Sequence, residues 1–153
     1  MVEKKHIRKE IFEKRKNLTQ EQVEKDSREI YQKIITLPQF QEATCVYAYV
    51  DYNKEVSTRE IIEQAWRMGK RVAVPKVTGP GTMKYYYLES FEQLKPGYFQ
   101  IPEPAWGEEA QEEEAFLIVP GVAFEFQIVK EVPAEATDVF PDLVITEKRV
   151  IQE

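Results

Sequence analysis

The sequence has very little of several residue types on which common protein classes depend. Cys45 is the only cysteine among the 153 residues, which excludes an internal disulfide framework and a zinc site built from several thiolates. His6 is the only histidine, so a multi-histidine metal site is excluded too. No apolar run approaches the roughly 20 residues of a membrane-spanning helix, and residues 1–6 lack the apolar stretch of a signal peptide. We therefore expect a cytoplasmic protein.

Glycine is also scarce, and the motifs that depend on it are missing. With six glycines, the chain contains neither a GxxxxGK[ST] phosphate loop nor a GxGxxG dinucleotide fingerprint. The GxSxG elbow of the α/β-hydrolases is absent as well. Function must therefore be inferred from weaker signals, through their order and position along the chain.

The charge is acidic overall but unevenly distributed. The net charge of −6 argues against nonspecific nucleic-acid binding, which needs a basic surface. Between Lys4 and Lys16, however, seven basic residues accompany only two acidic ones, whereas residues 103–114 hold six glutamates and no basic residue. A basic segment on an acidic protein suggests a local anion such as a phosphate. A solvated helix face is the simpler explanation when charge alone is considered.

The hydrophobic pattern predicts three main helices. Residues 4–16 carry an apolar stripe that includes Ile7 and Ile11. Thr19 is the expected N-cap of a second helix, which stops before Pro38. Ser57 and Glu60 predict a capping box for a third helix, and Gly69 is its stop signal. Ser90 is expected to cap a short helical turn, followed by a long surface loop at 95–114.

Short apolar runs between these helices predict a sheet that is mostly parallel. The expected strands are residues 45–50, 71–75, 83–88, 116–119 and 142–146, with an edge strand at 149–151. The first two flank a helix and form a βαβ unit. The predicted class is α/β, in one domain over residues 1–153, with a mostly parallel sheet whose strands are covered on both faces. A ligand should then bind beyond the carboxyl ends of the strands.

A few residues near the expected strand ends are candidates for function. Glu55 could accept hydrogen bonds from a ligand amine or amide, or be an ordinary loop acid. Asp138 could hold Mg²⁺, or be a turn aspartate. Tyr98 and Phe99 could stack on a flat ligand ring, or anchor their loop. Cys45, inside a strand, is expected to be an inert core thiol.

These pieces occur in an order that resembles the 5-formyltetrahydrofolate cyclo-ligase family. Each motif is weak alone, but the ordered set covers nearly the whole chain. The matching segments lie at residues 4–18, 55–62, 69–76, 97–104, 118–124, 132–138 and 142–146.

The resemblance implies an enzyme that uses ATP and Mg²⁺ to convert 5-formyltetrahydrofolate into 5,10-methenyltetrahydrofolate, with release of ADP and phosphate. It implies a three-layer fold with helices on both faces of the sheet, similar to the NagB/RpiA/CoA-transferase-like proteins. It places ATP contacts at Lys4, Lys5, His6, Ile7 and Arg8, folate contacts at Val50, Glu55 and Phe99, and a metal ligand at Asp138. No catalytic nucleophile is implied, because phosphoryl transfer depends mainly on positioning and charge neutralisation.

The chain departs from the family at one point. Members carry a glycine-rich phosphate loop soon after the stretch that corresponds to residues 120–124, and here Phe124 runs directly into Glu125. Either a segment is missing from the sequence as written, or the chain has lost the loop. The first explanation is favoured, because a crossover between parallel strands needs a dozen or more residues.

Three functions are therefore compared. The first is the ATP-dependent cyclo-ligase, expected to act as a monomer on small-molecule substrates, without nucleic acid or membrane partners. The second is a non-catalytic relative that binds folate or nucleotide but lacks the phosphate loop. The third, an α/β sugar-phosphate isomerase-like protein, would share only the fold.

Overall fold

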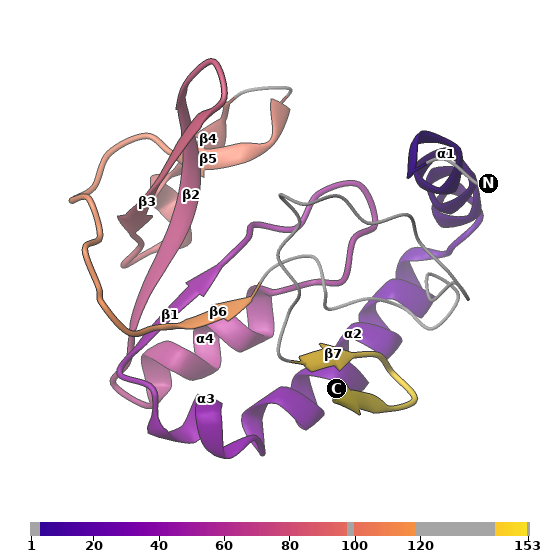
Figure 1. Cartoon of the computed structure of the whole chain (residues 1–153), viewed down its shortest axis with the longest axis horizontal. Helices are drawn as coiled ribbons and strands as arrows, with labels where there is room; N and C mark the ends of the chain where they lie inside the picture. Colours follow the sequence, from indigo (N-terminus) through magenta and orange to yellow (C-terminus); the bar gives the residue numbers. More distant parts are fainter. Residues whose placement is uncertain (1–3, 98–99, 119–142, 153) are drawn as a thin grey trace.

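The structure is a computed structural model that describes residues 4–97, 100–118 and 143–152 (Figure 1). The helices are α1 (Lys4–Lys16), α2 (Gln20–Ile35), α3 (Pro38–Glu42) and α4 (Arg59–Arg67), with a 3₁₀ turn, η1 (Phe91–Gln93). The strands are β1 (Cys45–Ala48), β2 (Arg71–Gly79), β3 (Thr82–Tyr87), β4 (Leu94–Pro96), β5 (Pro102–Pro104), β6 (Phe116–Ile118), β7 (Leu143–Ile145) and β8 (Val150–Gln152).

Four of these strands form the main sheet, in the order β3-β2-β1-β6. Within this sheet, β1 pairs in parallel with β2 and with β6, and β2 pairs antiparallel with β3. The predicted unit of strand, helix and parallel strand is therefore confirmed as β1, α4 and β2. The protein has a mixed α/β fold with a mostly parallel four-stranded sheet.

The hydrophobic core lies between one face of this sheet and the helices. Val46 and Val72 on neighbouring strands are buried with Ile61 and Ile62 of α4 and with residues of α2. Because side chains alternate along a strand, Leu117 of β6 lies on the opposite face, where 54% of it is exposed. Within the described residues, the helices that pack on the sheet lie on one face, so this part of the chain lacks the predicted second helical layer.

Two of the predicted helix boundaries are set by the local signals read from the sequence. At the start of α2, the Thr19 hydroxyl accepts the main-chain N–H of Gln22, and the Gln22 side chain accepts that of Thr19. At the end of α4, Gly69 has φ +77°, and the Lys70 N–H reaches the Ala65 carbonyl at 2.9 Å. The predicted Ser90 cap of a short helical turn is also confirmed at η1, where Ser90 forms a capping box with Gln93.

Other elements differ from the sequence prediction. The prediction of a loop over residues 95–114 was wrong in part, because β4 and β5 pair antiparallel there. Pro38 begins α3 in addition to following α2, which fits the tolerance of a helix's first turn for proline. β7 and β8 form a separate two-stranded sheet that contacts α2, so residues 143–152 do not extend the main sheet.

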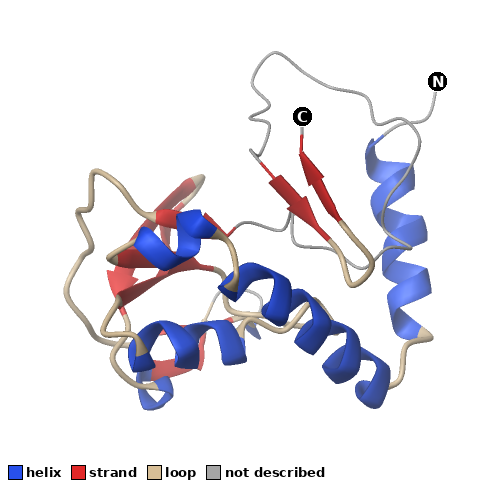
Figure 2. Cartoon of the chain, turned by 90° about the horizontal axis from the view of Figure 1, so that it is seen from below, coloured by secondary structure: helices blue, strands red, loops and turns tan. Residues whose placement is uncertain are grey.

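Helix α1 stands apart from the four-stranded sheet, and both views of the chain agree on this (Figures 1 and 2). Its side chains are mostly exposed, and Ile7 is its buried residue. In the part of the chain that the structure describes, no helix is both long and apolar enough to cross a membrane.

Candidate functional site

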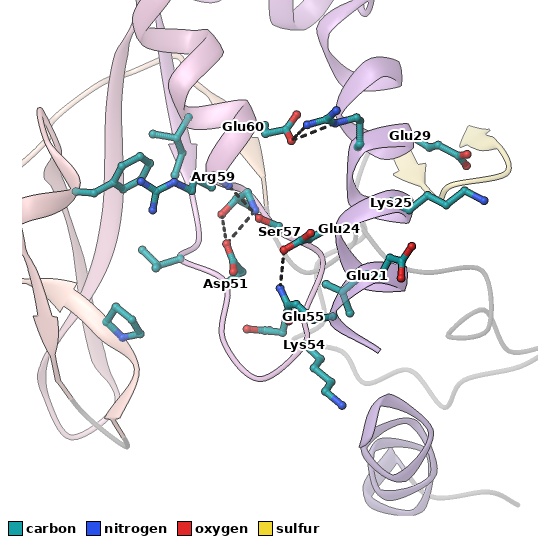
Figure 3. Close-up of a pocket in the computed structure, with 18 of the residues that line it drawn as sticks. Glu21, Glu24, Lys25, Glu29, Asp51, Lys54, Glu55, Ser57, Arg59 and Glu60 are labelled. Carbon is teal, nitrogen blue, oxygen red and sulfur yellow. Dashed lines mark hydrogen bonds and ion pairs between the residues drawn. The ribbon is translucent and has the colours of Figure 1, made fainter. Parts of the chain in front are cut away.

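A cleft of about 1020 Å³ opens beyond the carboxyl end of β1. One wall is α2, with Val23, Glu24 and Arg28. The floor is the segment from Val50 to the first turn of α4, and the other wall is formed by η1, β4 and β5 (Figure 3). The cleft lies at the end of the sheet where a ligand was predicted to bind.

The floor of the cleft includes a tight turn that fixes Glu55. Asn53 and Lys54 both have positive φ, +54° and +62°, and the Glu55 N–H returns to the Tyr52 carbonyl at 3.2 Å. This backbone resembles a type I′ turn. The Glu55 carboxylate also accepts the Tyr52 N–H, with 2.8 Å between Oε1 and N. The carboxylate is therefore held in one orientation before any ligand binds.

Partial burial shapes the electrostatics of Glu55. Burial raises its pKa, while the Tyr52 N–H and the positive charge of Arg15 oppose the rise. A half-buried carboxylate with one donor still has lone pairs to satisfy. Donor groups on a ligand would satisfy them.

Arg15 brings the last turn of α1 to this turn. Its charge favours the ionised forms of both Glu55 and Tyr49. Its Nε atom is buried and has no hydrogen-bond partner among the described residues. Burial raises the pKa of Tyr49, so its phenol stays neutral and donates to the Val56 carbonyl at 2.7 Å.

The first turn of α4 is capped by a residue that the sequence pattern did not identify. The expected capping box of Ser57 and Glu60 was wrong, because α4 begins at Arg59 and Glu60 pairs with Arg28 of α2 at 2.9 Å. Instead, Asp51 accepts the main-chain N–H of Thr58 at 3.0 Å and lies 3.3 Å from its hydroxyl. A carboxylate seven residues upstream thus replaces the local cap.

A lysine joins the cleft floor to the end of α1. The Lys54 ammonium donates to the carbonyls of Lys16 and Leu18, at 3.0 and 2.6 Å. The last carbonyls of a helix lack partners within it, and a cation there is favourable. The segment that carries the predicted ATP residues is therefore tied to the turn that carries Glu55.

Two predicted folate residues, Val50 and Glu55, line the same cleft. The third, Phe99, lies outside the described residues, although β4 and β5 on either side of it contribute Leu94 and Pro102 to the cleft. Asp138, the predicted metal ligand, and the point after Phe124 where the phosphate loop was expected also lie outside them. Within the described ranges, no group of three or more metal-binding side chains comes together.

The predicted ATP residues form the first turns of α1 and do not line the cleft. Ile7 is buried, Arg8 is exposed, and the His6 ring lies 3.3 Å from the Glu10 carboxylate. Lys4 and Arg8 are four residues apart and so share one helix face. Their role with ATP stays a prediction.

Cys45 is confirmed as a core residue. It is 1% exposed, and burial raises the pKa of its thiol to about 11. It is therefore a neutral thiol at physiological pH, which removes it from the candidates for a nucleophile.

One wall of the cleft carries a group that sequence reasoning missed. The Arg59 guanidinium lies 4.2 Å from the centroid of the Phe91 ring. The two residues are 32 positions apart, on α4 and η1. No periodic or capping signal links them, because only the packing of η1 against α4 brings them together.

A mixed α/β fold with a cleft beyond the carboxyl end of a parallel strand has the arrangement in which α/β proteins commonly bind small molecules. A model of the 5-formyltetrahydrofolate cyclo-ligase family matches residues 1–126. The chain belongs to this family.

Individual relatives agree with this assignment. A probable 5-formyltetrahydrofolate cyclo-ligase from Caenorhabditis elegans is 29% identical over 116 residues, which is 70% of this chain and 56% of that protein. The 5-formyltetrahydrofolate cyclo-ligase of Escherichia coli K12 is 34% identical over 96 residues, or 61% of this chain and 53% of the relative. The chain thus spans about half the length of the curated relatives it matches.

Two solved structures share the fold. The NMR structure of a 5,10-methenyltetrahydrofolate synthetase from Aquifex aeolicus has a TM-score of 0.83 at 26% identity, over 97% of this chain and 91% of the other. A 5,10-methenyltetrahydrofolate synthetase from Mycoplasma pneumoniae has a TM-score of 0.68 at 18% identity, over 95% of this chain and 99% of the other. The second likeness supports the fold alone.

Proposed function

We propose that this chain converts 5-formyltetrahydrofolate into 5,10-methenyltetrahydrofolate at the expense of ATP. The observation that carries the proposal is the cleft, because Val50 and Glu55, the two described folate positions implied by the family resemblance, line it together. In the proposed reaction the formyl oxygen bonds to the γ-phosphorus as ADP leaves. N10 then attacks the formyl carbon and loses its proton, and the formyl oxygen departs with the phosphate.

Glu55 is proposed to orient the folate. The pterin ring carries an exocyclic amine and a ring N–H, and a carboxylate is their natural acceptor. Because the Tyr52 N–H fixes the Glu55 carboxylate at 2.8 Å, little side-chain freedom is lost when the ring binds. Val50 would contribute apolar contact beside it.

The N-terminal part of α1, with Lys4, Lys5, His6, Ile7 and Arg8, is proposed to bind the phosphates of ATP. The main-chain N–H groups of a helix's first turn have no partners within the helix, so they attract anions. The first turn of α1 also contains no acidic residue. Lys4 and Arg8 on one face would add two cations beside those N–H groups.

Mg²⁺ is proposed as the metal cofactor, with Asp138 as a ligand. A hard divalent cation bound to phosphate oxygens would neutralise charge during phosphoryl transfer. We also propose the three-layer NagB/RpiA/CoA-transferase-like arrangement that the resemblance implies. From the sequence pattern itself we propose action as a monomer and a cytoplasmic location.

The test is a spectrophotometric assay with purified protein, 5-formyltetrahydrofolate, ATP and Mg²⁺, following the near-ultraviolet absorbance of the methenyl product. We expect product only when both ATP and Mg²⁺ are present. Omitting each in turn is the control. A protein that binds 5-formyltetrahydrofolate in calorimetry and never consumes ATP would be the non-catalytic relative considered above.

The intact mass of the same preparation separates the two explanations for the missing phosphate loop. A mass near 18.0 kDa means that the chain lacks the loop, whereas a clearly larger mass means that it carries a further segment. Without the loop we expect folate binding and no turnover. The phosphates would then lack the backbone N–H groups with which the loop surrounds them, and side-chain cations alone do not replace these donors.

A further inference from the structure

Arg59 is held in place at the wall of the cleft by an aromatic stack. Its guanidinium lies over the Phe91 ring at 4.2 Å, and Phe91 packs on Trp66 with 5.0 Å between ring centroids. The Trp66 indole N–H in turn donates to the Leu88 carbonyl at 3.0 Å. An arginine oriented in this way loses less side-chain entropy when it binds a ligand than a mobile one does.

The contacts of Arg59 leave its outer face open to a ligand. Within the described residues, its one polar side-chain contact is between Nε and the Glu63 carboxylate, at 3.1 Å. Both terminal NH₂ groups can therefore form the paired hydrogen bonds that a carboxylate accepts from arginine. The side chain is 65% exposed, so its ion pair with Glu63 contributes little to the stability of the fold.

The other cations of the cleft are less suited to this task. Four basic residues line it in the described part of the chain, namely Lys25, Arg28, Lys54 and Arg59. Arg28 is paired with Glu60, and Lys54 is bound to two carbonyls at the end of α1. Figure 3 shows Lys25 directed away from the wall that β4 and β5 form. Arg59 is the one that points toward that wall.

We propose that Arg59 binds a carboxylate of the glutamate tail of the folate. This inference rests on the proposed function, and it assigns opposite ends of the substrate to different parts of the cleft. The donor-rich pterin meets Glu55, and the anionic tail meets Arg59. Leu94 and Pro102 also line the cleft and would give apolar contacts to the aromatic ring that links pterin and tail.

The experiment compares two ligands that differ only in the tail. One is 5-formyltetrahydrofolate, and the other is 5-formyltetrahydropteroate, which has the same pterin and benzoyl groups but no glutamate. Dissociation constants are measured by calorimetry for the wild-type protein and for Arg59→Gln. Arg67→Gln is the matched control, since Arg67 is exposed in the last turn of the same helix, contacts Gln64 and does not line the cleft.

We expect the wild-type protein to bind the folate about tenfold more tightly than the pteroate. Arg59→Gln should abolish that preference by weakening folate binding alone, and Arg67→Gln should change neither constant. Equal folate affinity in Arg59→Gln and wild type would overturn the assignment of Arg59 and leave the proposed function standing. Failure of the wild-type protein to bind either ligand would instead overturn the proposed function.

A second measurement separates tail recognition from a general effect of charge. Arg59→Lys keeps the positive charge but loses the planar pair of donors and the stack on Phe91. We expect it to recover only part of the preference for the folate. Full recovery would contradict the paired hydrogen bonds, and thermal unfolding of each variant shows whether its fold is intact.

Discussion

Asp51 caps helix α4 by accepting the main-chain N–H of Thr58, with 3.0 Å between Oδ1 and N. The same oxygen lies 3.3 Å from the Thr58 hydroxyl, which donates to the Tyr49 carbonyl at 2.8 Å. Thr58 is 1% exposed, so without this acceptor its N–H would be buried and unpaired. One carboxylate therefore shapes the floor of the cleft and starts the helix that carries Arg59.

The first prediction concerns this cap. Asp51→Ala should lower the free energy of unfolding by about 1–2 kcal/mol, the usual cost of losing an N-cap acceptor. Asp51→Asn should cost less, because its amide oxygen can still accept the Thr58 N–H. Urea denaturation of the three proteins is the measurement. Equal stability of the alanine variant and the wild type would show that Asp51 is not the cap.

The second prediction concerns Glu55 and the folate. Glu55→Gln replaces one of two acceptor oxygens with a donor, which would face the donors of the pterin ring. Folate affinity should fall by about tenfold or more, with ATP affinity unchanged. Calorimetric titration with each ligand tests this. Glu60→Gln, which also lines the cleft, is the control for lost negative charge. Unchanged folate affinity in Glu55→Gln would remove Glu55 from the site.

The third prediction concerns the pH dependence of stability at the same residue. Burial raises the pKa of Glu55 in the folded protein, although the Tyr52 N–H and Arg15 oppose it. Between the unfolded and the folded pKa values, the folded state holds more protons than the unfolded state. The free energy of unfolding must then fall as pH rises through this window, and the loss persists at neutral pH.

The amide side chain that Glu55→Gln introduces cannot ionise, but its oxygen can still accept the Tyr52 N–H. The stability of this variant relative to the wild type should therefore rise between about pH 3 and about pH 7. Urea denaturation at a series of pH values gives the difference. A relative stability that falls with pH would mean that the carboxylate is stabilised, and not penalised, by its surroundings.

The fourth prediction concerns α1. Arg8→Ala should weaken ATP binding by about 1.5–3 kcal/mol if the guanidinium contacts a phosphate. The fold should survive, because Arg8 is exposed. Lys14→Ala is a suitable control, as an exposed cation in the last turn of the same helix. Equal losses in both variants would indicate general electrostatic attraction, and no loss in either would remove α1 from the ATP site.

The fifth prediction concerns the link between α1 and the cleft. Lys54→Met keeps a long apolar side chain but removes the donor to the Lys16 and Leu18 carbonyls. The free energy of unfolding should fall by about 1 kcal/mol. The amides of α1 should exchange with solvent faster than in the wild type, whereas those of α4 should not change. Unchanged exchange in α1 would show that other contacts hold this helix in place.

Local patterns in the sequence determined most of the elements. Some signals act over only a few residues, so they can be read directly from the sequence. They include the capping pair Thr19 and Gln22, the stop at Gly69 and the apolar run at Cys45. The parallel pairing of β1 and β2 followed from the helix between them. The ordered motifs also indicated the family, and the resemblance predicted folate contacts at Val50 and Glu55, which both line the cleft.

Tertiary structure decided what depends on contacts between distant segments. Ser57 and Glu60 have the spacing of a capping box, yet Asp51 takes the cap because the turn after β1 brings its carboxylate to the start of α4. Spacing along the sequence indicates which hydrogen bonds are possible, but not which acceptor lies closest to the N–H group in the folded chain. The antiparallel pairing of β4 with β5 within an expected loop has the same origin, since it depends on a partner strand.

The cleft shows most clearly which features could be predicted from the sequence and which depended on tertiary structure. Its floor was predictable, because the end of a parallel strand is a ligand site by topology. Its walls were not, because α2 and the segment from Phe91 to Pro102 meet the floor only through packing. The stack of Arg59 on Phe91 joins positions 32 residues apart. Such pairings arise from the shape of the buried core, which the sequence determines only through the whole fold.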